Sequence, residues 1–172
     1  MTPTTLIIVA LALSGVPHAN GKFTYVNYSP DTRYSDADGR TYLVVDFPNR
    51  SYSYGHNFGV VGDCDSRSDG DACISLGFIK ILEPVNGCRV GERHQMGQTE
   101  FTTTRIEKLM LAGQALDGCR VEATENGTLV NSYLYSTERG VVSISLPAFG
   151  SEYVKSLSFF LEESQGIFGP QD

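Results

Sequence analysis

The sequence predicts an all-β fold, mainly antiparallel, with little helix outside an N-terminal export signal. Apolar and polar residues alternate in many short segments, which is typical of strands with one buried face. Gly, Asn, Asp and Pro separate these segments, as expected for turns between antiparallel strands. We therefore expect one curved meander sheet, arranged as a barrel-like structure or a sandwich.

Three segments in the first half of the chain have a period of two residues. The residues that share one face are Phe23 and Tyr25, with Asn27 as a possible third; Leu43, Val45 and Phe47; and Ile74, Leu76 and Phe78. Ile79 and Ile81 continue the third pattern in the opposite phase. A change of phase within one strand predicts a β-bulge at this point.

The second half contains the strongest turn in the sequence, Asn126-Gly127. Both residues tolerate the positive φ that a two-residue hairpin requires, so we expect antiparallel strands on either side. The alternating faces here are Cys119, Val121 and Ala123; Val142, Ile144 and Leu146; and Leu157, Phe159 and Leu161.

The segment from Phe101 to Gly113 fits two structures. Ile106, Leu109 and Met110 have helical spacing, with a threonine available as N-cap. The β-branched run before them, and a second alternation through the same residues, fit a strand as well, so these residues leave both structures open.

Residues 1–21 have the composition of a cleavable secretory signal. They contain no Lys, Arg, Asp or Glu, and Leu6–Leu13 is an unbroken apolar run. This run is too short to cross a bilayer as a helix, which needs about 20 residues. We expect cleavage after Gly21, which leaves residues 22–172 as a single disulfide-bonded β domain; the alternative is cleavage after Ala19. We expect this domain to be periplasmic or secreted and to have no transmembrane segment.

The cysteines agree with export. An even number of cysteines in an oxidising compartment predicts two disulfides, with three possible connectivities. We favour Cys64–Cys73, which closes a short polar loop, and Cys88–Cys119, which ties together more distant elements. A zinc site is less consistent with the sequence because no pair has C-x-x-C spacing. We expect no metal and no cofactor.

The net charge of −7 argues against nucleic acid and anionic membranes as partners. Binding to phosphates needs clustered Lys and Arg, and the basic residues here are scattered.

Two stretches resemble a β-meander found in bacterial cell-envelope proteins of uncharacterised families. Leu109–Glu122 reads L-M-L-A-G-Q-A-L-D-G-C-R-V-E, and Tyr133–Val142 reads Y-L-Y-S-T-E-R-G-V-V. The sequence departs from that pattern at Ala115, where Phe is usual, and at Thr137, where Pro is usual. The resemblance implies a curved antiparallel sheet, a strand over 101–113 and an envelope location. It carries over no functional residue.

The loop between Cys64 and Cys73 is a candidate binding loop through Asp65, Asp69 and Asp71. Several carboxylates and a glycine in one short loop suit a hard cation such as calcium. Arg67 and Leu76 stand where an EF-hand loop needs further ligands, so a solvated, disulfide-closed loop is the better interpretation.

Tyrosines crowd the first third of the mature chain, and Tyr42, Tyr52 and Tyr54 are a candidate recognition face. The side chain of tyrosine is rigid and amphipathic, which suits contact with a protein or a sugar. Tyrosine is also a common strand former at a half-wet sheet face, and that accounts for most of the pattern.

No catalytic motif stands out, so we expect a non-catalytic binding or interaction module whose partner is another envelope or extracellular protein. One alternative is a secreted hydrolase that uses His56 or His94 with a carboxylate. In the sequence both histidines have polar, turn-like neighbours, as solvent-exposed residues do. A second alternative is a carrier of a small apolar ligand inside a β-barrel.

Overall fold

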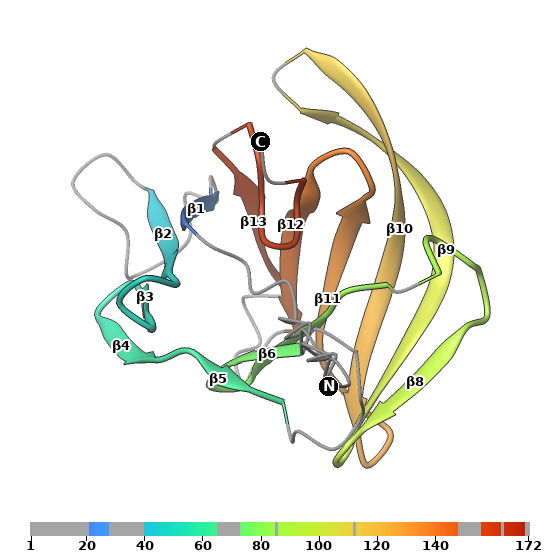
Figure 1. Ribbon diagram of the computed structural model, residues 1–172, viewed down its shortest axis with the longest axis horizontal. Coiled ribbons are helices and arrows are strands. Elements are labelled where there is room, and N and C mark those ends of the chain that lie inside the picture. The colour runs from blue at the N-terminus through green and yellow to red at the C-terminus, as the bar shows by residue number, and fades with distance from the viewer. Residues whose placement is uncertain are drawn as a thin grey trace, which may run out of the picture.

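The computed structural model describes residues 21–27, 40–64, 73–84, 86–111, 113–147, 156–162 and 164–170. Every regular element in these ranges is a β-strand, and all paired strands are antiparallel. The predicted all-β, antiparallel class is therefore confirmed. Figure 1 shows a strongly curved large sheet, with a small sheet lying across it.

The large sheet has ten strands, and the small sheet has three. In spatial order, the large sheet consists of β4 (Asn57–Val60), β3 (Ser51–Tyr54), β2 (Thr41–Asp46), β1 (Lys22–Asn27), β13 (Ser156–Leu161), β12 (Gly140–Pro147), β11 (Thr128–Ser136), β10 (Gln114–Glu125), β9 (Thr99–Leu111) and β8 (Arg93–Met96). The small sheet consists of β5 (Gly62–Asp63), β6 (Cys73–Leu76) and β7 (Ile79–Leu82).

Pairing between β1 and β13 joins the first and last strands in the middle of the large sheet. Every other pair of neighbouring strands in this sheet is formed by strands that follow one another in the sequence, as in a meander. The strands β4 and β8 are edges, so the sheet does not close into a barrel. The enclosing barrel that a carrier of small ligands would need is not formed by the described strands.

The core lies on one face of the large sheet, where residues of most of its strands are buried, whereas β3 is only half-buried and β4 is largely exposed. Cross-strand register aligns these residues in rows, so apolar side chains from neighbouring strands pack side by side. One row runs through Leu43, Tyr25 and Leu161, and another through Val121, Tyr133, Ile144 and Phe159.

Two side chains of β11 hold the small sheet against this face. Asn131 Oδ1 accepts the Lys80 N–H at 2.8 Å, and Asn131 Nδ2 donates to the Lys80 carbonyl at 2.9 Å. The Tyr133 hydroxyl accepts the Leu82 N–H at 3.1 Å and donates to the Leu82 carbonyl at 2.6 Å. These side chains thus take the place of a neighbouring strand for β7.

The C-terminal segment is bound to the sheet through the buried phenol of Tyr25. This hydroxyl donates to the Val141 carbonyl at 3.0 Å and accepts the Ile167 N–H at 3.1 Å. The Val141 N–H in turn donates to the Ile167 carbonyl at 2.8 Å. Residues near the two ends of the described chain therefore meet at the start of β12.

The structure tests two turn predictions. The hairpin at Asn126-Gly127 is confirmed, with φ of 51° and 76° at the two residues. The bulge predicted between Leu76 and Ile79 is wrong, because a two-residue turn at Gly77-Phe78 joins β6 to β7 there. Gly77 has a φ of 66°, which an L-residue rarely adopts, and so it allows the chain to reverse.

The ambiguous segment is a strand. β9 pairs with β10 along nearly its whole length, which excludes the helical alternative. Both favoured disulfides, Cys64–Cys73 and Cys88–Cys119, are present. The described residues include no helix long and apolar enough to cross a membrane.

The predicted secretory signal lies outside the described residues except for Gly21. The Gly21 carbonyl accepts a hydrogen bond from the Phe47 N–H at 3.0 Å, just beyond the end of the β1–β2 pairing.

Candidate functional site

The predicted recognition face of Tyr42, Tyr52 and Tyr54 does not form on one side of the sheet. Tyr52 and Tyr54 lie opposite the buried Val45 and Leu43, so they belong to the core face. Tyr54 packs edge-on against Phe159 with ring centroids 5.5 Å apart. Tyr42 alternates with these residues and points to the other face.

The predicted binding loop, with Asp65, Asp69 and Asp71, lies outside the described residues, although the Cys64–Cys73 disulfide that closes it is described. Within the described ranges, His, Cys, Asp and Glu side chains form no group of three that could hold a metal ion.

The two histidines have different environments. His56 is exposed in the turn between β3 and β4, as the sequence suggests. His94 was expected in a turn but lies in β8, where it pairs with Phe101 on the core face and is only 26% exposed.

A carboxylate lies beside His94. His94 Nε2 is 3.4 Å from Glu92 Oε1, and Asn86 Nδ2 donates to the same oxygen at 2.9 Å. The hydrogen bond from Asn86, followed by the charge of His94, lowers the pKa of Glu92. His94 Nε2 makes no hydrogen bond to any described residue, so it is not bonded to a hydroxyl that it could activate.

A second carboxyl, Glu83, lies near Tyr135, close to where the Cys88–Cys119 disulfide meets β11. Burial raises the pKa of Glu83. Burial, and then the charge of Glu83, raise the pKa of Tyr135. Cys88 Sγ also lies 3.8 Å from the Tyr135 carbonyl. These contacts and the Cys88–Cys119 disulfide hold the segment after β7 against β11 and β10.

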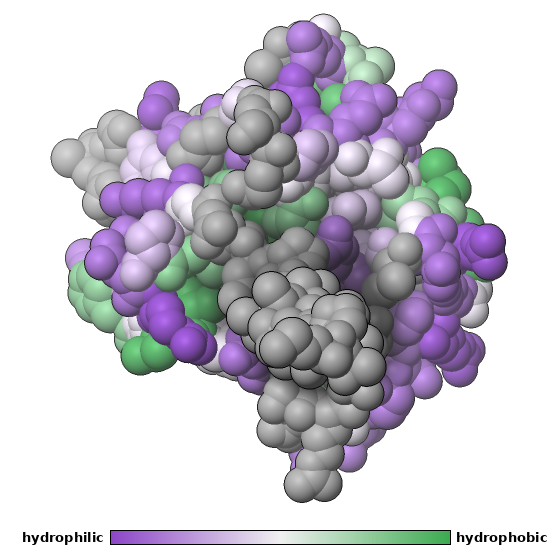
Figure 2. Space-filling model, in the orientation of Figure 1, coloured by the Kyte–Doolittle hydropathy of each residue, from purple (hydrophilic) through white to green (hydrophobic). Residues whose placement is uncertain are grey.

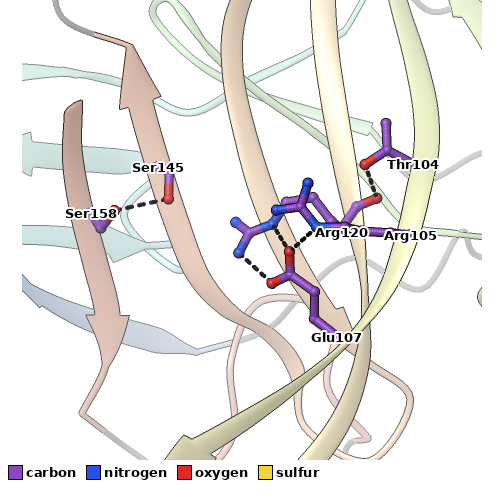
Figure 3. A network of polar contacts seen from close by, with 6 residues as sticks. All are labelled: Thr104, Arg105, Glu107, Arg120, Ser145 and Ser158. Atoms are coloured by element: carbon purple, nitrogen blue, oxygen red, sulfur yellow. Dashed lines mark hydrogen bonds and ion pairs between the residues drawn. The ribbon is translucent and has the colours of Figure 1, made fainter. Parts of the chain in front are cut away.

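An ion-pair network joins β9 and β10 (Figure 3). Arg120 binds Glu107 through two nitrogens, at 2.7 Å and 3.2 Å, and Arg105 contacts the same carboxylate. The hydrogen bond from Arg120 is the main cause of the lowered pKa of Glu107. Because both guanidinium groups bind the one Glu107 carboxylate and so tie β9 to β10, this network has the character of a structural clamp.

The most distinctive surface feature is the edge strand β4. Its residues Phe58 and Val60 are 81% and 72% exposed, and they are the two most exposed large apolar side chains in the described parts of the chain. They alternate along the strand, so they share one face of it. Figure 2 shows hydrophobic surface over the side of the molecule on which β4 and β5 lie.

The backbone of β4 also has free hydrogen-bonding groups. The Val61 N–H donates to the Arg50 carbonyl, and Tyr52 and Tyr54 lie opposite Gly59 and Asn57. In this register the hydrogen-bonded pairs alternate, so the N–H and C=O groups of Phe58 and Val60 point away from β3. No strand in the described ranges pairs with them.

The packing of Tyr52 explains why position 59, on the core side of β4, is a glycine without a side chain. A Cβ atom on Gly59 would lie 2.4 Å from the Tyr52 ring, so only glycine fits here. The two larger side chains of β4 are therefore both on the opposite face, where they are exposed.

The other edge of the sheet is different in character. β8 carries Arg93, which pairs with Glu100 on β9 at 3.9 Å, and His94 follows it. Charged side chains on an edge oppose the addition of another strand. β4 contains no Asp, Glu, Lys or Arg.

The β4 edge was missed in the sequence analysis. The pattern that could have found it is Gly55-His56 as a turn, followed by Asn-Phe-Gly-Val, in which two apolar residues alternate without a charge. Its exposure depends on the order of strands in the sheet, which the sequence does not reveal.

Comparison with known proteins adds no relative. No protein-family model, curated protein or solved structure matches the chain.

Proposed function

We propose that the chain is an exported, non-catalytic binding module that captures a protein partner at the β4 edge. The observation that carries this proposal is the combination, on one edge, of exposed Phe58 and Val60 with backbone groups that no described strand pairs. Strand addition uses such an edge, because backbone hydrogen bonds provide affinity and alternate side chains provide specificity.

Two features support export to an oxidising compartment. The apolar run Leu6–Leu13 has the length of a secretory signal, and the structure contains two disulfides. The periplasm and the extracellular space are both oxidising, and both agree with the envelope location that the resemblance implies.

The geometry favours binding over hydrolysis. In the Glu92–His94 pair, no described hydroxyl is hydrogen-bonded to His94 Nε2. The described residues also contain no group of three His, Cys, Asp or Glu side chains that could hold a metal ion. The β4 edge, by contrast, has apolar surface that ordinary soluble proteins protect.

A photo-crosslinker at position 58 tests this proposal. Phe58→benzoylphenylalanine, expressed in an exporting host, should give a covalent adduct with a protein after irradiation. The matched control is the same substitution at Val90, which is 58% exposed and lies outside β4. Equal adducts from both positions, or none from position 58, would contradict the proposal.

A further inference from the structure

We infer that the strand accepted by the β4 edge is β4 of a second copy of this chain, an inference that rests on the proposed function. The two strands would pair antiparallel across a twofold axis and join two ten-stranded sheets into one. The reasons are the position of the free backbone groups, the fit of the side chains and the absence of charge.

The free backbone groups select one register. An antiparallel pair forms its full set of bonds when Phe58 lies opposite Val60 of the second copy, because both residues then present outward groups. By symmetry the pair occurs twice, which gives four hydrogen bonds. Sliding by two residues in one direction places Val60 opposite His56 in the turn. Sliding the other way places Phe58 opposite Gly62, which already pairs with Ser75.

The side chains fit in the same register. Each Phe58 ring lies opposite the smaller Val60 of the other copy, so four exposed apolar side chains form one cluster on one face of the joined sheet. On the opposite face, Gly59 meets Gly59 at the twofold axis. The Tyr52 rings, which already cover Gly59 in each copy, therefore face no bulky side chain from the partner strand.

Charge favours this edge over the other one. A chain with a net charge of −7 repels its own copies in general, but β4 carries no charged side chain. Two β8 strands would bring copies of Arg93 together. An interface of two four-residue strands is small, so we expect a weak dimer whose population depends on protein concentration.

Sedimentation velocity of the disulfide-bonded protein, from about 1 μM to about 1 mM, measures this equilibrium. The wild type should shift from monomer to dimer as concentration rises. Val60→Lys places a charge in the apolar cluster and should raise the dissociation constant at least about ten-fold. Val90→Lys adds the same charge at an exposed position outside β4 and should leave the constant unchanged.

A pair of variants tests the register. Phe58→Glu should weaken the dimer, as Val60→Lys should. When the two variants are mixed, Lys at position 60 of one copy lies opposite Glu at position 58 of the other. The mixture should therefore form a heterodimer that neither variant forms alone.

A wild type that stays monomeric at every concentration would overturn the inference. So would equal effects of Val60→Lys and Val90→Lys, or a mixture without heterodimer. If the wild type is monomeric while position 58 still crosslinks to a different protein, the proposed function stands and only the identity of the strand is wrong. If neither dimer nor adduct forms, both are wrong.

Discussion

At the scale of single residues, two polar side chains on the core face of β11 hold the small sheet in place. Asn131 and Tyr133 satisfy the backbone groups of Lys80 and Leu82 on the edge of β7. Both side chains are buried, and burial raises the pKa of the Tyr133 hydroxyl, so this group stays a donor.

Removing the Tyr133 hydroxyl should therefore destabilise the protein. Tyr133→Phe leaves the N–H and C=O of Leu82 buried without their partner, which costs about 1–3 kcal/mol. Urea unfolding followed by circular dichroism measures the change. Tyr52→Phe is the control, because it keeps the ring packed on Gly59 and should have a much smaller effect. Equal losses in the two variants would show that the hydroxyl does not support β7.

The Glu107 clamp should make stability depend on pH. Its folded pKa is lowered from the ordinary value of 4.5, so its contribution is present above that value and is lost as the pH falls through the lowered pKa. At neutral pH, Glu107→Gln should cost about 1 kcal/mol. Between about pH 5 and about pH 3 the wild type should lose stability more steeply than Glu107→Gln.

Asp117→Asn provides the comparison for this prediction. Asp117 pairs with Lys108 at 3.8 Å, but both side chains are largely exposed, so the pair contributes little. Parallel pH profiles for the wild type and Glu107→Gln would remove the clamp from the account of stability.

Sequence reasoning at this scale found the apolar core better than the polar contacts. The alternation of Leu43 with Val45, and of Ile144 with Leu146, predicts their buried face directly. No local pattern identifies the contact of Asn131, because its partner is the backbone of Lys80, 51 residues away in the sequence. The pairing of Arg120 with Glu107 likewise depends on the register of β9 against β10.

At the scale of elements, local turn chemistry decided which strand predictions were correct. Asn126-Gly127 has both residues that a tight hairpin needs, and β10 and β11 follow as predicted. At Gly77-Phe78, the apolar Phe78 continued the alternation and concealed the turn, so two short strands looked like one. Periodicity alone cannot separate a phase change within a strand from a hairpin.

The two disulfides should contribute unequally. Cys64–Cys73 spans 9 positions and Cys88–Cys119 spans 31, so the second removes more entropy from the unfolded chain. Replacing Cys88 and Cys119 by alanine should therefore cost about 1 kcal/mol more than replacing Cys64 and Cys73. Thermal unfolding of the two double variants, in the absence of reductant, makes the comparison. A larger loss from the shorter loop would contradict the chain-entropy argument.

At the scale of the whole molecule, a backbone hydrogen bond at Gly21, directly before the first strand of the large sheet, bears on the site of cleavage. Cleavage after Ala19 would keep the bond between the Gly21 carbonyl and the Phe47 N–H, whereas cleavage after Gly21 would remove it. We therefore expect the exported protein to begin at Asn20. Intact mass spectrometry of material from the host identifies the first residue, and a chain that starts at Lys22 or still at Met1 would contradict this expectation.

The overall architecture was predictable only as a class. The antiparallel meander follows from alternation and turns, but the pairing of β1 with β13 joins segments more than a hundred residues apart and leaves β4 and β8 as edges. Nothing local in the sequence specifies which strands become edges. Because the candidate site is an edge strand, local sequence patterns could not predict its position.

Hydrogen–deuterium exchange at the Phe58 and Val60 amides tests most directly whether β4 accepts a strand. In the monomer these two N–H groups point away from β3 and should exchange quickly. The account predicts that both become protected as protein concentration rises, while the amides of β8 do not change. Fast exchange at every concentration and with every binding partner would contradict it, and so would full protection in the dilute monomer.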